Sequence, residues 1–165
     1  MEKMEKKGKK GKGVKAAGNF KRILLPTDFS AVSENALSCA RSLAKRHGSK
    51  LYVVHVVDFR NDAAGFYVPH LSFDKLEGEM REGAMAMLKR FCSVRLKALK
   101  AFEMRVLDGE PYKEILKFSK DENVDLIVMG VSSRGKVDKF FFGSTTERVI
   151  RKADRPVMVV PPQAG

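Results

Sequence analysis

From Phe20 onward, short apolar runs alternate with longer stretches in which apolar and polar positions are mixed. Apolar runs of roughly four to eight residues between turn signals are typical of buried strands, whereas apolar positions spaced three or four residues apart predict helices. This pattern predicts strands at about 21–26, 50–59, 102–107, 124–130 and 155–162. Helices are expected at about 30–46, 73–98, 111–122 and 144–152, and loops at 60–71 and 131–142.

The alternation of strands and helices predicts a single-domain α/β fold with a parallel sheet. Residues 50–59 are β-branched on both faces, which suits a strand covered by helices on both sides and hence a three-layer sandwich. In a five-stranded sheet with flavodoxin-like order, ligands collect beyond the carboxyl ends of the first and fourth strands, where strand order reverses. We therefore expect a ligand site just after Pro26 and just after Met129.

The first of these places holds Pro26-Thr27-Asp28, followed two residues later by Ser30. An aspartate here can accept hydrogen bonds from the hydroxyls or the amine of a ligand. The same position also favours Asp28 as a cap for the first helix, although Ser30 offers a cap as well. Both interpretations stay open on the sequence.

The second place begins at Gly130, where a glycine permits a sharp exit from the strand and a close backbone approach. Gly143-Ser144 then opens a helix, whose N–H groups and dipole favour an anion such as phosphate. Ser144 and Glu147 have the spacing of a capping box. The alternative is a structural loop that leads into a capped helix.

Other motifs in this region do not fit their usual chemistry. Residues 130–137 resemble a Walker A loop, but Val137 has no hydroxyl for Mg²⁺ and no helix is expected to start at Lys136. A GxGxxG fingerprint is absent, and no catalytic constellation is found. His55 is interpreted as a hydrogen-bonded core residue, and Cys39 and Cys92 as packing residues.

The composition narrows the class of protein. The chain has 165 residues, 44% hydrophobic and 32% charged, which predicts about one globular domain. No apolar run approaches the roughly 20 residues of a membrane span. The N-terminus lacks the apolar region of a secretory signal, and two cysteines are too few for a disulfide framework or a zinc site. We therefore expect a cytoplasmic protein without a membrane-spanning segment.

The net charge of +12 is unevenly spread: residues 1–18 hold seven lysines against Glu2 and Glu5, a net charge of +5 in this short segment. Such a lysine- and glycine-rich segment has little to bury, so we expect a disordered basic tail at 1–18 and a folded domain at 19–162. The tail is either a solubilising extension or a weak, salt-sensitive contact for nucleic acid or another polyanion. No aromatic residue interleaves the lysines to support base stacking.

Four segments in order resemble the universal stress protein family: ILLPTDFS (23–30), VVHVVD (53–58), VDLIVMG (124–130) and GSTTERVIRKADRPVMVV (143–160). The resemblance covers about residues 20–161. It implies one α/β domain of the adenine nucleotide alpha hydrolase-like type, with sheet order 3-2-1-4-5. It also implies a cytoplasmic homodimer, often paired through the last strand, here residues 155–160.

Members of the family that bind ATP carry the motif G-x2-G-x9-G-S/T after the fourth strand. Gly130 and Gly143-Ser144 match this motif at the right spacing, but Ser133 replaces the middle glycine. If that position needs a left-handed backbone, the side chain costs about 1–2 kcal/mol.

The resemblance implies that ATP or AMP binds here, with Mg²⁺ as an optional companion. Asp28 would contact the adenosine, and Pro26 and Thr27 would shape that end of the site. The Val56 backbone would contact adenine. The base and ribose would lie against Met129 and Gly130, and the phosphates would be surrounded by Ser133, Gly143, Ser144 and Thr145.

The resulting hypothesis is a stress-response sensor or regulator that works through a homodimer. Because no general base or dedicated magnesium carboxylate is evident, any ATP hydrolysis is expected to be slow. The alternative, which Ser133 favours, is a nucleotide-free dimeric module that acts on a protein partner. A third interpretation is nucleic-acid binding through the tail.

Overall fold

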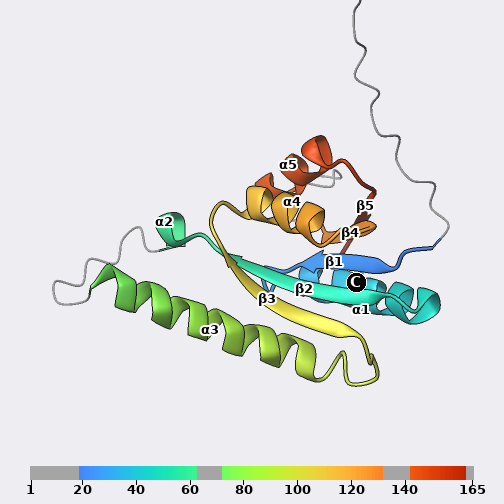
Figure 1. The fold of residues 1–165 in the computed structure, drawn as a ribbon, viewed down its shortest axis with the longest axis horizontal. Coiled ribbons are helices and arrows are strands. Elements are labelled where there is room, and N and C mark those ends of the chain that lie inside the picture. Colours follow the sequence, from blue (N-terminus) through green and yellow to red (C-terminus); the bar gives the residue numbers. More distant parts are fainter. Residues whose placement is uncertain (1–18, 63–71, 132–141, 163–165) are drawn as a thin grey trace, which may run out of the picture.

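Strands and helices alternate through the described part of the chain, residues 19–62, 72–131 and 142–162 of a computed structural model (Figure 1). The basic tail expected at 1–18, and Ser133 with the rest of 132–141, lie outside these residues. In chain order the elements are β1 (Arg22–Pro26), α1 (Ala31–His47), β2 (Lys50–Val57), α2 (Phe59–Asp62), α3 (Phe73–Ser93), β3 (Phe102–Asp108), α4 (Pro111–Asp121), β4 (Leu126–Gly130), α5 (Ser144–Lys152) and β5 (Val157–Val160).

The strands form one parallel sheet in the order β3-β2-β1-β4-β5, as predicted. In the centre of the sheet, Leu24 of β1 is in register with Ile127 of β4. The ends of β1 and β4 are therefore neighbours, although most of the chain separates them in sequence. The two segments that were expected to share a ligand site are thus brought to the same edge.

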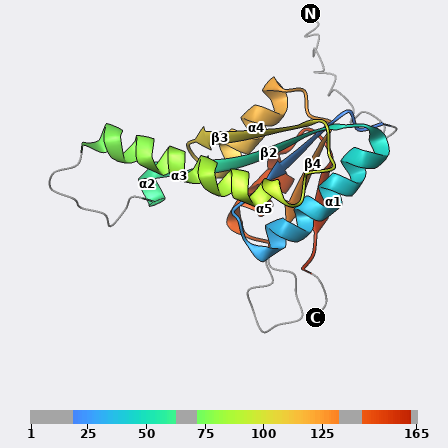
Figure 2. The same cartoon turned by 90° about the horizontal axis from the view of Figure 1, so that it is seen from below.

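Helices cover both faces of the sheet and make three layers (Figures 1 and 2). On one face, Ile23 and Leu25 of β1 pack with α1 and α3, represented by Leu37 and Leu88. On the other face, Leu24 and Ile127 pack with Ile115 of α4 and Val149 of α5. Ile23, Leu24 and Leu25 point alternately to the two layers and are all fully buried, so this part of β1 must be apolar, whereas Arg22 at its start is exposed.

The start and end of α1 are fixed by local chemistry. The Ser30 side chain accepts a hydrogen bond from the Ser33 backbone N–H and caps the first turn. Gly48 ends the helix at φ +63°, a left-handed conformation that favours glycine. The basic residues of the last turn complement the helix dipole. The helix thus begins beside the end of β1 and ends at the opposite edge of the sheet.

Several predicted boundaries were wrong. The third helix ends at Ser93 instead of 98, and the chain then turns so that Leu96 is fully buried in the core. The second strand ends at Val57 instead of 59, and the short helix α2 occupies Phe59 and the start of the expected loop, because the Asp58 carbonyl accepts backbone hydrogen bonds from Asn61 and Asp62. The fourth and fifth strands begin two residues later than expected, at Leu126 and Val157.

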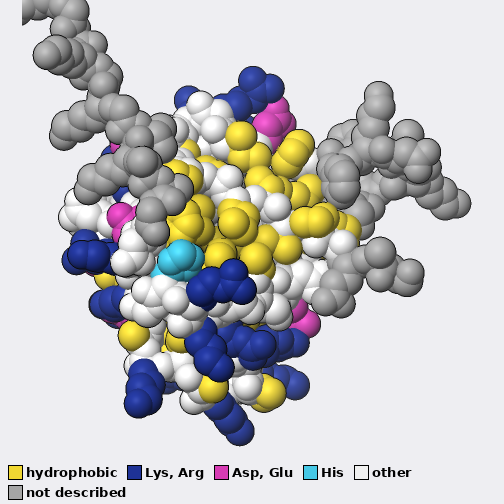
Figure 3. Space-filling view, turned by 90° about the vertical axis from the view of Figure 1, so that its right-hand side faces the viewer, with side chains coloured by type: hydrophobic (Ala, Val, Ile, Leu, Met, Phe, Trp, Pro, Cys, Tyr) yellow, Lys and Arg dark blue, Asp and Glu magenta, His cyan; other side chains and the backbone are white. Residues whose placement is uncertain are grey.

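The two edges of the sheet differ in chemistry. On β3, Glu103 forms ion pairs with Lys50 and Arg105. The edge strand β5 consists of Val157-Met158-Val159-Val160, all of them half-buried. Figure 3 shows hydrophobic side chains gathered on the side of the molecule where β5 lies.

In the described residues, no helix is long and apolar enough to cross a bilayer.

Candidate functional site

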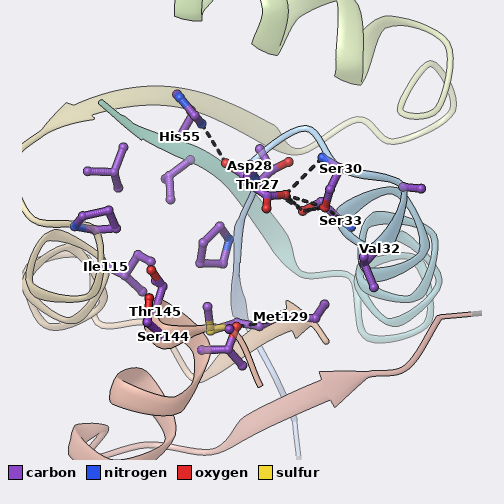
Figure 4. A pocket seen from close by; sticks show the side chains of 18 residues that line it. Thr27, Asp28, Ser30, Val32, Ser33, His55, Ile115, Met129, Ser144 and Thr145 are labelled. Carbon is purple, nitrogen blue, oxygen red and sulfur yellow. Dashed lines mark hydrogen bonds between the residues drawn. The ribbon is translucent and has the colours of Figure 1, made fainter. Parts of the chain in front are cut away.

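A cavity of about 660 Å³ lies at the carboxyl ends of β1, β2 and β4 (Figure 4). This volume is in the usual range for a small-molecule site. The predicted site residues that line it are Pro26, Thr27, Asp28, Val56, Met129, Gly130, Gly143, Ser144 and Thr145. The remaining predicted residue, Ser133, is outside the described part of the chain.

The Asp28 carboxylate organises the turn between β1 and α1. Its Oδ1 atom accepts hydrogen bonds from the Ser30 backbone N–H at 3.0 Å, the Ser30 hydroxyl at 2.5 Å and the Ser33 hydroxyl at 2.6 Å. Ser30, and not Asp28, caps the helix directly. Burial opposes ionisation of this carboxyl, but the hydrogen bonds from Ser30 and Ser33 prevail and hold its pKa below its ordinary value. Asp28 therefore carries a negative charge at neutral pH.

Phe29 follows Asp28 with a left-handed backbone, φ +64°, which is rare for a bulky residue. Its ring packs on the His55 ring at a centroid distance of 4.4 Å and on Phe91 at 5.8 Å. His55 Nδ1 lies 2.8 Å from the Thr27 carbonyl oxygen, which can only accept, so Nδ1 donates. His55 is thus hydrogen-bonded, as predicted, but it is half-buried at the cavity and not part of the core. It helps to fix the turn that directs Asp28.

Gly130 is required by the close approach of β4 to the first turn of α1. A Cβ atom at this position would lie 2.7 Å from the Val32 carbonyl oxygen and 2.9 Å from the Val32 carbonyl carbon. The close backbone approach expected from the sequence is confirmed, and its partner is the start of α1. This contact holds the β4 side of the cavity against the α1 side.

The N-terminus of α5 forms the other side of the cavity, opposite Asp28 and Ser33 (Figure 4). Gly143 is the N-cap residue, and because it has no side chain it cannot cap the N–H groups of the first turn. The first helical bond runs from Glu147 N–H to the Gly143 carbonyl, so the N–H groups of residues 144–146 have no acceptor within the helix. Thr146 donates from its hydroxyl to the Gly130 carbonyl at 3.4 Å, which ties α5 to the end of β4.

The predicted capping box at Ser144 and Glu147 was wrong. Ser144 is the first helical residue and not the N-cap, so its hydroxyl is not in the capping position. Glu147 instead pairs with Arg151 one turn later, at 2.9 Å. The open amides of α5 are therefore available to a ligand.

Some lining residues were not predicted. Val32 and Ser33 belong to the first turn of α1, Pro111 and Ile115 to α4, and Thr146 to α5. The glycine at position 130 predicted that another part of the chain or a ligand approaches the backbone closely. It did not indicate that this part is Val32 of α1. The helical pattern of 111–122 predicts a buried face, yet not which residues of that face lie over the strand ends.

The two sides of the cavity are chemically different. Asp28 is the one acidic residue in its described lining, at the β1 end, while the amide groups of α5 carry partial positive charge at the other side. The arrangement suits an elongated ligand with hydrogen-bond donors at one end and an anion at the other. Among the described residues, no group of three or more His, Cys, Asp or Glu is placed to hold a metal ion.

Residues 19–161 match the family model described as Universal stress protein family. The chain belongs to the universal stress protein family.

Individual universal stress proteins resemble the chain over most of its length. Universal stress protein MJ0577 of Methanocaldococcus jannaschii is 31% identical over 156 residues, covering 86% of this chain and 94% of that protein. A universal stress protein of Thermus aquaticus is 32% identical over 146 residues, covering 86% of this chain and 98% of that protein.

Solved structures of universal stress proteins share the fold. The structure of MJ0577 superposes with a TM-score of 0.72 at 28% identity, covering 88% of this chain and 99% of that chain. A universal stress protein in complex with cAMP has a TM-score of 0.64 at 20% identity, with 88% and 100% covered. One from Archaeoglobus fulgidus in complex with dAMP has a TM-score of 0.61 at 24% identity, with 86% and 98% covered.

Proposed function

We propose that this stress-response protein binds ATP or AMP in the cavity between β1 and β4 and acts as a cytoplasmic sensor or regulator. The observation that carries the proposal is the convergence of the Asp28 carboxylate and the open N-terminus of α5 on one cavity. A nucleotide has matching ends, because its nucleoside offers hydroxyl and amine donors and its phosphates are anionic.

In this proposal the nucleoside lies on the β1 side. The Oδ1 atom of Asp28 is held by Ser30 and Ser33, which orients the carboxylate toward the ribose hydroxyls or the amine. Val56 offers its backbone to adenine, and Met129 and Gly130 lie against the base and ribose. The apolar lining near Val54 and Ile115 suits a flat heterocycle.

The phosphates would lie at the start of α5. Ser144 and Thr145 line the cavity, and a helix N-terminus favours phosphate through both its amides and its dipole. By resemblance, Ser133 completes this part of the site. Because Asp28 is the one carboxylate in the described lining, Mg²⁺ would accompany the phosphates of ATP and depend on them for ligands. For the same reason we propose at most slow ATP hydrolysis.

Two solved structures support the idea that this fold holds adenine nucleotides, since one contains cAMP and the other dAMP. At 20% and 24% identity, the likeness to them concerns the fold. The residues of this chain that line the cavity supply the remaining support.

Calorimetric titration of the full chain with ATP and with AMP tests the proposal. Binding should be abolished or weakened at least about tenfold in Ser144→Ala and in Asp28→Ala, since charged hydrogen bonds contribute about 1.5–3 kcal/mol each. Ser42→Ala, an exposed serine on α1, is the matched control and should bind normally. No heat of binding at millimolar nucleotide would overturn the proposal.

A homodimer through β5 is the second part of the proposal. The β5 edge carries only apolar side chains, whereas the β3 edge carries the ion-paired Glu103 and Arg105. Charged side chains protect a strand edge from pairing, so β5 is the edge suited to a second copy.

The apolar β5 edge is also compatible with the alternative, a nucleotide-free dimeric module that acts on a protein partner. Mass spectrometry of small molecules released by denaturing the purified protein distinguishes the nucleotide sensor from this module. Co-purified adenine nucleotide supports the sensor, and a dimer that carries none and binds none supports the module. The basic tail at 1–18 is proposed as a weak polyanion contact in either case.

A further inference from the structure

A basic surface lies at the end of the molecule opposite the cavity. It consists of Arg41, Lys45 and Arg46 in the last turns of α1, and Lys89, Arg90, Arg95, Lys97 and Lys100 at the end of α3 and in the following turn. Residues 41–47 and 89–100 contain no aspartate or glutamate. All of these basic side chains are exposed except the half-buried Arg95.

The two segments form one surface. Arg41 donates from Nη1 to the Arg95 carbonyl oxygen at 2.9 Å, which joins α1 to the turn after α3. Glu34, on the same side of α1, pairs with Arg95 at 2.6 Å and is the acidic residue that contacts the surface. In Figure 3, Lys and Arg side chains gather below the hydrophobic patch, on the side where α1 ends.

Helix capping explains only part of this charge. Lys45 and Arg46 complement the carboxyl end of α1. Lys97 and Lys100 follow the end of α3 and belong to no helix. Among the described residues, Arg95 is the one member of this surface that forms an ion pair, so the surface presents seven exposed cations without a counter-charge, Lys45, Lys97 and Lys100 among them.

We propose that this basic surface binds the phosphate backbone of double-helical nucleic acid without sequence preference. The aromatic rings of the two segments are Phe91, which is buried, and His47, which is half-buried against Phe20, so the surface offers little open ring face for stacking on unpaired bases. Val94 is the one large hydrophobic side chain exposed there, which is too little apolar area to insert into a bilayer. Lysine and arginine without aromatic or apolar anchors suit phosphates, which attract them through a salt-dependent counterion effect.

The point at which the chain enters the fold also favours a phosphate-rich ligand for this surface. The Phe20 ring contacts the His47 ring at a centroid distance of 5.5 Å, so the chain enters the fold beside the basic end of α1. The seven lysines of residues 1–18 are attached there. The basic residues 1–18 thus precede the fold at the same end of the domain as this surface.

Binding of the full chain to a fluorescein-labelled duplex of mixed sequence, measured by anisotropy at several salt concentrations, tests the proposal. The triple variant Lys45→Gln, Lys97→Gln, Lys100→Gln should weaken binding about tenfold at low salt. It should also reduce the salt dependence by roughly 0.9 log units per log unit of salt for each phosphate that is no longer neutralised. Lys117→Gln, Lys120→Gln, Lys152→Gln is the matched control, with the same charge change on the α4–α5 layer.

Equal effects of the two triple variants would overturn the proposal, because net charge alone would then explain binding. It would also be overturned if replacing the seven tail lysines by glutamine abolished binding while the surface variant bound normally, or if the chain did not bind duplex at all. Tighter, surface-dependent binding to vesicles containing phosphatidylserine would overturn it in favour of a membrane. Saturating AMP should leave duplex binding unchanged, so this test does not depend on the cavity being a nucleotide site.

Discussion

At the scale of single residues, the two motif glycines in the described chain serve different purposes. Gly130 has no room for a Cβ atom beside the Val32 carbonyl, whereas Gly143 has ordinary helical-cap backbone angles and open space around it. We predict that Gly130→Ala lowers the free energy of unfolding by about 1–3 kcal/mol, because the overlap must be relieved by backbone shifts.

Gly143→Ala should cost under about 1 kcal/mol, since alanine is only a poorer N-cap than glycine. If the glycine serves close approach of the phosphates, this variant still loses affinity for AMP. Urea denaturation and calorimetry on both variants measure the two quantities separately. A Gly130→Ala protein as stable as the parent would contradict the contact geometry.

The serines at the two helix starts make a similar contrast. Ser30 caps α1 and donates to Asp28, while Ser144 caps nothing. We predict that Ser30→Ala costs about 1–2 kcal/mol of stability, and that Ser144→Ala leaves the denaturation midpoint nearly unchanged. Thermal and urea melts followed by circular dichroism provide the measurement, and equal destabilisation by both substitutions would contradict the assignment.

Asp28 makes stability depend on pH in a definite direction. Its folded-state pKa lies below the ordinary value, so ionised Asp28 stabilises the fold above its unfolded pKa of about 3.9. This contribution disappears as the pH falls through the lower, folded-state pKa. The difference in free energy of unfolding between the parent and Asp28→Asn should be constant above about pH 5 and shrink below it. A difference that grows in acid would contradict the hydrogen-bond arrangement.

At the scale of elements, hydrophobic periodicity predicted the type of nearly every strand and helix, and it failed where tertiary contacts decide. The helix from Phe73 ends early because burial of Leu96 requires a turn, and a local pattern does not contain that requirement. The short α2 depends on hydrogen bonds to Asp58 that span only a few residues. Such short elements have too few apolar positions to show a period.

The edge strand β5 carries its own prediction. A lysine at Val159 would place a charge in the centre of an apolar edge, where pairing with a second copy would bury it. If the proposed β5 dimer forms, Val159→Lys should therefore convert it to monomer in sedimentation experiments. Arg105→Lys, which keeps the charge of the β3 edge, is the control and should leave the assembly as it is.

At the scale of the whole molecule, the sequence predicted the location of the cavity better than its walls. Chain alternation and strand order lead to the ends of β1 and β4, because topology alone places them together. Ile115 and Val32 join the lining through the angles at which α4 and α1 cross the sheet. Those angles follow from packing of complete side-chain layers, which is a property of the assembled fold.

A ligand that bridges β1, α1 and α5 should stabilise the whole domain by mass action. At a nucleotide concentration of about a hundred times Kd, the gain is about 2.7 kcal/mol. For a domain of this size that corresponds to a rise in Tm of roughly 5–10 °C. Differential scanning fluorimetry with AMP measures it, and an unchanged Tm at saturating AMP would contradict binding to the folded state.

The contact between Phe20 and His47 has a practical consequence for anyone who handles the protein. Because the chain enters the fold at the strand starts, a purification tag, fluorophore or surface tether attached ahead of residue 19 is rooted far from the cavity mouth at the strand ends. Immobilisation through the N-terminus therefore leaves that mouth facing the solution, whereas a tether after β5 would emerge on the same edge as the mouth.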